Sequence, residues 1–233
     1  MKKIKNAIIK IRDNLEKRRL RKRLNLTDFT IISNNCWGSF TYQKYGIEYK
    51  SPTVGLFILG HDFVKLCADW ENYFKSELVF IPWEQASYHY ALVEATPYPV
   101  AKLGDIEVYF MHYHSEEEAA EKWYRRIKRI NPDHMIFKLS QREECSKKDI
   151  EDFVKLPLKH KVCFSYDNVP AIKDLYQECK TKEYSFNHSA HTAREGKEVL
   201  FFSPNLGNIN LERNPIHYKA QRNELETIIV YKE

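Results

Sequence analysis

Amide, thiol and indole groups follow one another directly after an apolar, β-branched run, in the segment Asn34, Asn35, Cys36, Trp37 and Gly38. The run, Phe29 to Ile32, predicts a strand, and the polar segment predicts the loop at its carboxyl end. Such a loop could bind a ligand, with the amides bonding hydroxyls and the indole stacking on a ring. Cys36 would be a nucleophile only if a helix N-terminus or a protonated histidine favoured its thiolate. The alternatives are a buried thiol and a turn that bonds its own backbone.

His112 and His114 are two residues apart on a predicted strand, so their imidazoles would face the same side. Either could act as an acid, a base or a partner of a sugar hydroxyl. Two histidines alone do not specify a metal, because a zinc site needs three or four ligands, and we predict none. Structural histidines are the alternative.

Two acids, Asp62 and Asp167, stand at the predicted ends of strands and are candidate catalysts by position alone. Arg125 and Arg126, on a predicted helix, could hold a phosphate in a bidentate fork. Ordinary ion pairs with Glu121 or Glu118 on the same helix are the alternative, which we favour for at least one of the two arginines.

Strand and helix patterns alternate after the first strand and would position these side chains. Further strands are predicted at Val54–Leu59, Leu78–Ile81, Val100–Leu103, Ile106–Met111, Met135–Leu139, Val162–Ser165, Val199–Phe202 and Thr227–Tyr231. Helices are predicted at Asp62–Phe74, from the cap Ser115 to about Ile130, at Lys147–Val154 and at Pro170–Cys179. The pattern favours a three-layer α/β fold with a mostly parallel or mixed central sheet flanked by helices. Ligand sites are then expected where loops leave the carboxyl ends of strands.

The composition describes a chain that can fold unaided. Apolar residues make up 43% of the 233 residues and glycine only 7 positions, so we expect one α/β domain over residues 27–233. Five widely spaced cysteines without a CxxC, and no apolar block for export or for spanning a bilayer, favour a cytoplasmic protein. The Gly-rich nucleotide motifs, the serine elbow and the zincin motif are all absent, so the sequence indicates no particular cofactor.

The first 25 residues hold eleven Lys or Arg and two acids, a net charge of +9, and the remaining chain is −4. Ile4, Ile8, Ile11 and Leu15 fall on one stripe, so residues 1–26 are predicted to form a basic amphipathic helix. This helix could pack on the core or on a second copy of the chain, or could bind anionic lipid at the inner face of the membrane. Nucleic acid is disfavoured, because the charge lies in one terminal segment rather than across a folded face.

Two stretches, FTIISNNCWGSFTYQKYGIEYKSPTVGLFI and YPVAKLGDIEVYFMHYHSEEEAAEKWYRRIKRIN, resemble the bacterial domain-of-unknown-function 1919 family. The similarity extends from Phe29 to the C-terminus, includes PDHMIFKLSQREECSKKDIEDF and KVCFSYDN, and leaves the basic helix outside. Members are often described as exopolysaccharide or capsular polysaccharide biosynthesis proteins. The resemblance implies an α/β fold and glycan assembly, without a reaction. It adds Ser51 and Thr53 to the candidate ligand-binding residues, and it also covers Asn34–Gly38, His114, Arg125 and Arg126.

We therefore expect an enzyme of surface-polysaccharide assembly, a transferase that acts on a sugar nucleotide or a lipid-linked sugar. The alternative is a glycan-binding or assembly protein without catalysis, which would need no titratable pair in the same cleft. The sequence does not specify the sugar, the acceptor or the oligomeric state, and a homo-oligomer stays open.

Overall fold

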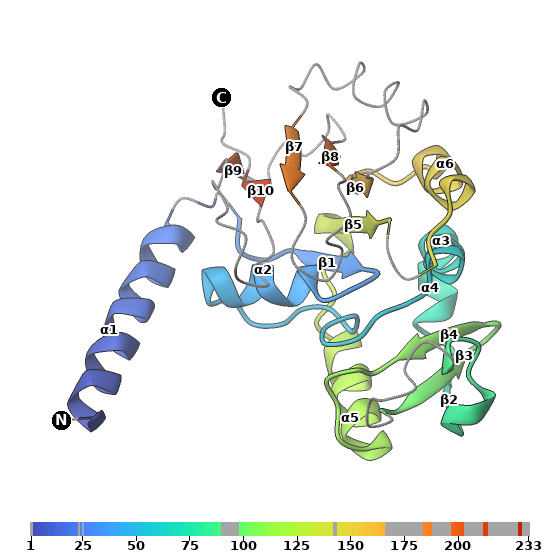
Figure 1. Ribbon diagram of the computed structural model, residues 1–233, viewed down its shortest axis with the longest axis horizontal. Helices are drawn as coiled ribbons and strands as arrows, with labels where there is room; N and C mark the ends of the chain where they lie inside the picture. Colours follow the sequence, from blue (N-terminus) through green and yellow to red (C-terminus); the bar gives the residue numbers. More distant parts are fainter. Residues whose placement is uncertain are drawn as a thin grey trace.

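The computed structural model describes residues 2–22, 24, 26–89, 98–141 and 144–165, and the backbone of four later strands. Its helices are α1 (Lys2–Arg21), α2 (Trp37–Tyr45), α3 (Gly60–Ala68), α4 (Trp70–Tyr73), α5 (Glu116–Ile127) and α6 (Lys147–Lys155), with short 3-10 turns η1 (Trp83–Gln85) and η3 (Pro132–His134). Its strands are β1 (Thr30–Ser33), β2 (Leu78–Ile81), β3 (Val100–Leu103), β4 (Ile106–Tyr109), β5 (Met135–Ser140), β6 (Lys161–Ser165), β7 (Tyr184–Asn187), β8 (Lys197–Phe202), β9 (Glu212–Arg213) and β10 (Ile228–Ile229). Figure 1 shows their arrangement.

Five strands form the central sheet in the order β1-β5-β6-β8-β7. Strands β1, β5 and β6 are parallel, whereas β8 runs antiparallel to β6 and β7 antiparallel to β8. The prediction of a mixed sheet is confirmed. Because β1, β5 and β6 are parallel, their carboxyl ends lie at the same edge of the sheet. We call this edge, with the residues that follow Ser33 and Ser140, the carboxyl edge.

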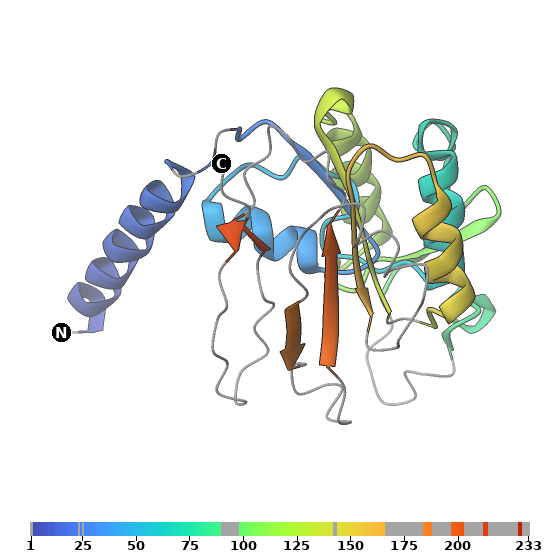
Figure 2. The same ribbon diagram turned by 90° about the horizontal axis from the view of Figure 1, so that it is seen from above.

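Alternate side chains of the parallel strands pack on opposite faces of this sheet. Phe137 and Leu139 join the core cluster that includes Phe63 of α3 and Phe153 of α6, and Ile136 packs on the other face with Trp37 of α2. Figure 2 shows α2 on one side of the strands and α3 and α6 on the other. This is the predicted three-layer arrangement. By the same alternation Lys138 shares the α2 face with Ile136.

A second, antiparallel sheet has the order β2-β3-β4. Its β3–β4 hairpin turns at Gly104 and Asp105, between two strands that the sequence predicted, and Gly104 adopts φ +63°, a left-handed conformation that suits glycine. Helix α5 covers this sheet with Trp123, which is fully buried and meets Phe74 and Phe110 edge to face.

The predicted strand Val54–Leu59 is not a strand. Phe57 makes one isolated bridge to Tyr109, and the next residue, Ile58, donates instead to the carbonyl of Asn34. The segment is buried because it fills the space between two sheets, and its hydrogen bonds go to two different neighbours, so no ladder forms. An apolar run of this length does not distinguish a buried strand from a buried segment without a strand ladder.

Two other predictions were wrong in detail. The helix predicted from Asp62 to Phe74 is interrupted at Asp69, whose φ of −143° ends α3 before α4 begins. The segment predicted as a loop up to Gly38 already contains the start of α2, because the side chain of Asn35 accepts a hydrogen bond from the N–H of Trp37 at 3.2 Å. The predicted helix Pro170–Cys179 lies outside the described residues.

Candidate functional site

Asn34 joins the ends of two parallel strands. Its Nδ2 donates to the carbonyl of Ser140 at 3.0 Å, and its Oδ1 accepts from the N–H of the same residue at 2.9 Å. The side chain therefore continues the β1–β5 ladder by one more pair of bonds, and it is fully buried. Its amide fixes the carboxyl edge rather than facing solvent.

Lys138 lies beneath Asn35 and was not predicted as a site residue. Its side chain is fully buried, and its ammonium donates to Asn35 Oδ1 at 2.9 Å and to Ser140 Oγ. The ammonium also lies 5.7 Å from the centre of the Trp37 ring, within reach of a cation–π attraction. A cation so far from water is costly unless it is compensated, and these contacts contribute to that compensation.

The side-chain amide of Asn35 has one hydrogen-bonded atom, Oδ1, and one atom without a partner among the described residues, Nδ2. Its Oδ1 accepts from Lys138 and from the N–H of Trp37, while no hydrogen bond is made by its Nδ2 within the described part of the chain. Only 7% of Asn35 is exposed. A buried donor without an acceptor costs about 1–3 kcal/mol, and such a group is a natural partner for a ligand acceptor.

Cys36 marks the start of α2, and its side chain forms no capping hydrogen bond. The thiol is half-buried and lies 3.7 Å from the sulfur of Met111, which is 40% exposed. The connection between β4 and α5 thus reaches the N-terminus of α2. Trp37 is 2% exposed, so its ring covers Lys138 and is not the surface stacking platform that we expected.

Ser51 and Thr53 support the end of β1 from a neighbouring loop. Thr53 Oγ1 accepts from the N–H of Ser33 at 3.1 Å and lies 3.0 Å from Ser51 Oγ. Both residues are buried. They complete the hydrogen bonding of the strand end, and they position the Asn34–Gly38 segment rather than present free hydroxyls.

His112 and His114 do not lie on a strand, because β4 ends at Tyr109. The argument that they face the same side therefore fails, and both are exposed in the connection to α5. His112 donates its N–H to the carbonyl of Gly55 at 3.1 Å, one residue from the Met111 that touches Cys36. The N–H of His114 donates to Glu118 at 2.8 Å, and this bond leads the interactions that lower the pKa of that carboxyl.

The two adjacent arginines of α5 have different roles. Arg125 is exposed and pairs with Glu121, with 2.6 Å between Nε and Oε1, as the helix-face alternative expected. Arg126 is buried and donates from Nη1 to the hydroxyl of Tyr113 at 2.5 Å and to the carbonyl of Val54 at 3.2 Å. It fastens α5 to the connection between α2 and α3, which also carries Ser51 and Thr53.

Asp62 belongs to a separate polar cluster. It lies in the first turn of α3, where its Oδ2 accepts from the N–H of Glu107 at 2.9 Å and its Oδ1 lies 3.3 Å from His61. Burial raises the pKa of Asp62, against the lowering effect of these partners. Glu107 in turn accepts from Ser87 and from the hydroxyl of Tyr109. The side chain of Asp62 thus contacts residues of α3 and of the β3–β4 hairpin rather than Asn35.

We expect Asp62→Asn to stabilise the protein at neutral pH. The pKa of Asp62 is higher in the folded protein than in the unfolded chain. The free energy of unfolding therefore falls as the pH rises from the unfolded-state pKa through the folded-state pKa. Asparagine does not titrate, and its Oδ1 still accepts from the N–H of Glu107. Urea unfolding between about pH 4 and pH 7 measures the difference. Parallel curves for the two proteins would contradict the assignment.

Asp105→Asn is the control for this substitution. Its carboxyl is exposed, and its hydrogen bond from Lys65 is the main cause of a lowered pKa, the opposite direction from Asp62. Removing that charge should therefore not stabilise the protein at neutral pH.

The structure thus gathers the Asn34–Gly38 segment with Ser51 and Thr53, adds Lys138 and Ser140, and brings Met111 and His112 to its rim. Asp167 lies outside the described residues. Lys138 had a signal in the sequence, since a lysine interrupts the apolar run of β5. Within the part of the chain that the structure describes, no three histidine, cysteine or acidic side chains gather as metal ligands.

Comparison with known proteins gives the family. The model of a domain of unknown function, DUF1919, matches residues 7–200. The chain belongs to the DUF1919 family. A relative from Haemophilus influenzae (strain Rd), described as an uncharacterized protein, is 36% identical over 174 residues, which cover 75% of this chain and 79% of the relative.

The DUF1919 match corrects the expected extent of the resemblance. It begins at residue 7, inside α1, so the basic helix is not outside the family as predicted. It ends in β8. Among the described residues, none of the helices combines the length and the apolar character that a bilayer crossing requires.

Proposed function

We propose that the protein is a transferase of surface-polysaccharide assembly that binds the phosphate of a sugar nucleotide or lipid-linked sugar at the carboxyl edge. The observation that carries the proposal is the buried ammonium of Lys138 beside the unpartnered Nδ2 of Asn35. The polysaccharide context is supported by the resemblance described above, and the group transferred is part of the proposal.

An anion fits this place for three reasons. A cation and an amide donor already stand there, and charge-assisted hydrogen bonds to phosphate are roughly twice as strong as neutral ones. The N-terminus of α2 adds the positive end of its dipole, and the side chain of Cys36 does not cap it. In open α/β sheets, ligands bind outside the carboxyl ends of the strands, where these groups lie.

The transfer step needs a base, and His112 at the rim is the candidate. In this step an acceptor hydroxyl loses its proton to the imidazole and its oxygen bonds the anomeric carbon. The bond from that carbon to the phosphate oxygen breaks, and Lys138 stabilises the departing phosphate. The exposed position of His112 beside Met111 and Gly55 supports this role.

Calorimetry with UDP-glucose, UDP-galactose and UDP tests the binding claim, with free glucose as the control. We expect the three nucleotides to bind and glucose alone not to bind. Asn35→Ala should weaken binding about tenfold, because it removes the Nδ2 donor. It should also lower the melting temperature, because Lys138 and the N–H of Trp37 lose their shared acceptor, so the affinity is measured where the variant is folded. Folded protein that binds none of the panel would contradict the proposal.

The second candidate is glycan binding without catalysis. It is favoured by the contacts of Asp62, whose carboxylate is engaged with Glu107 and His61 instead of facing Asn35. The two candidates differ in turnover. Release of UDP from a bound donor in the presence of acceptor glycans, lost in His112→Ala, supports the transferase. Tight binding with no release supports the second candidate.

A further inference from the structure

Most of helix α1 stands away from the other labelled helices and strands in both views (Figures 1 and 2). Its last turn touches α2, where Arg21 Nη1 donates to the carbonyl of Gly46 at 2.5 Å. The side chain of Lys17, one turn earlier, also borders Gly46. These two residues define the side of α1 that faces the core.

The apolar stripe of α1 points elsewhere. Ile4, Ile8, Ile11 and Leu15 are 67%, 61%, 60% and 59% exposed. By helical geometry their stripe lies roughly a third of a turn from the Lys17–Arg21 side. Four large aliphatic side chains on one protruding face are more than the scattered apolar exposure that is normal for a protein surface.

Cations border this stripe and acids do not. Lys5, Arg12 and Arg19 recur at seven-residue intervals, which places them along one edge of it, and Arg18 lies on the other edge. All four are exposed. The stripe therefore lies between positive charges, the arrangement of helices that rest on anionic lipid.

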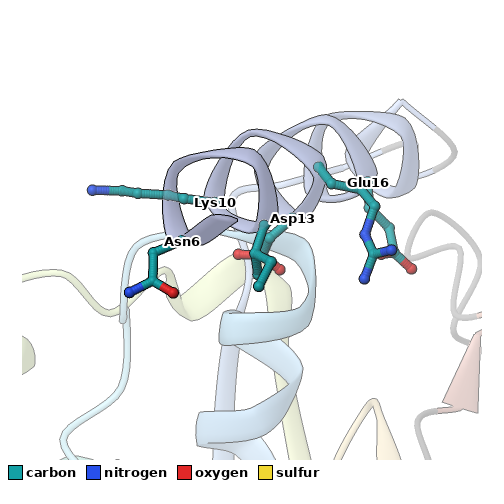
Figure 3. Close-up of a pocket in the computed structure, with 6 residues that line it drawn as sticks. Asn6, Lys10, Asp13 and Glu16 are labelled. Carbon is teal, nitrogen blue, oxygen red and sulfur yellow. The ribbon is translucent and has the colours of Figure 1, made fainter. Parts of the chain in front are cut away.

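The two acids of α1 lie off the stripe: Asp13 is on the opposite face, and Glu16, four residues after Arg12, lies beyond the Arg12 edge. Asp13 and Glu16 line a hollow together with Asn6, Ile9, Lys10 and Arg12 (Figure 3). Asp13 also pairs with Lys17 at 2.7 Å. The four cations thus lie nearer to the stripe than either acid does, so an anionic surface that approaches the stripe meets positive charge first.

We propose that α1 lies on the surface of an anionic lipid bilayer, with the Ile4–Leu15 stripe in the headgroup boundary and the flanking cations on lipid phosphates. This inference does not depend on the proposed activity, since it uses none of the residues at the carboxyl edge. A second copy fits the stripe less well, because two helices that each carry a large positive charge repel one another. A nucleic acid would leave the isoleucines without a partner.

Vesicle sedimentation of the full chain tests this inference with a matched pair of isoleucines. Vesicles of phosphatidylcholine with 30% phosphatidylglycerol should bind the protein, and pure phosphatidylcholine should bind it much more weakly. Ile8→Ser should weaken binding about fivefold, because part of an isoleucine leaves the apolar boundary. Ile9→Ser, 48% exposed on the opposite face, should change binding by less than about twofold.

A second pair of variants distinguishes the effect of a cation's position from the effect of net charge. Arg12→Gln beside the stripe should weaken binding to anionic vesicles more than Lys10→Gln, although both remove one positive charge. Equal effects within either pair, or equal binding to neutral vesicles, would overturn the inference. So would a self-associated protein in ultracentrifugation that Ile8→Ser makes monomeric, or tight RNA binding with no binding to vesicles. Unchanged melting of all four variants shows that the fold is kept.

Discussion

Lys138→Met should lower the affinity for a UDP-sugar about 100-fold, because it removes a charge-assisted hydrogen bond that has no substitute among the described side chains at this edge. The methionine keeps the length and apolar stem of lysine, so the α2 face of the sheet stays filled. Calorimetry against UDP-glucose, with a melting curve of each protein, measures the change.

Lys161→Met is the matched control for Lys138→Met. Lys161 is also a buried lysine of the central sheet, 6% exposed, but its ammonium donates to the carbonyls of Val154 and Leu156 at the end of α6. Its loss should destabilise the protein by about 1–2 kcal/mol and leave the affinity of the folded protein unchanged. Equal affinity of both variants and the parent would remove Lys138 from the site.

Gly60→Ala should destabilise the protein by about 3 kcal/mol or more, because backbone must move to admit a methyl group. A Cβ at Gly60 would lie 2.4 Å from Cys145 Cα and 2.5 Å from Cys145 Cβ. Glycine at the start of α3 therefore lets this helix touch the connection from β5 to α6. Urea unfolding measures the loss.

Gly38→Ala serves as the comparison for Gly60→Ala. Its nearest neighbour would be Ile31 Cγ2 at 3.1 Å, the end of a side chain that can give by a few tenths of an ångström. Alanine is also the better helix former by about 1 kcal/mol, so the net loss should be at most about 1 kcal/mol. Equal losses of unfolding free energy at the two glycines would show that close packing of α3 on the β5–α6 connection does not require glycine at position 60.

Local patterns predicted most of the central fold. Ser115 was predicted to cap the long helix, and its hydroxyl accepts from the N–H of Glu118 at 3.2 Å. The short strands β5 and β6 and the β3–β4 hairpin follow from β-branched runs and turn residues. These features depend on residues that are close together in the sequence, so they can be predicted from one sequence alone.

The candidate site depended on distant neighbours. Asn34 looked like a free amide, but its partner Ser140 is 106 residues away, on a strand whose adjacency to β1 no local pattern encodes. Lys138 can be assigned to the candidate site only once β5 is known to lie between β1 and β6, because this arrangement directs its side chain toward α2. The histidines were misjudged because the strand before them ends at Tyr109.

Crystals grown with UDP-glucose test the central claim most directly. The account predicts density for the diphosphate within hydrogen-bonding distance of Lys138 Nζ or Asn35 Nδ2, in front of the first turn of α2. Density for the nucleotide at another place, with Asn35 and Lys138 still bonded to each other and to no ligand, would contradict it.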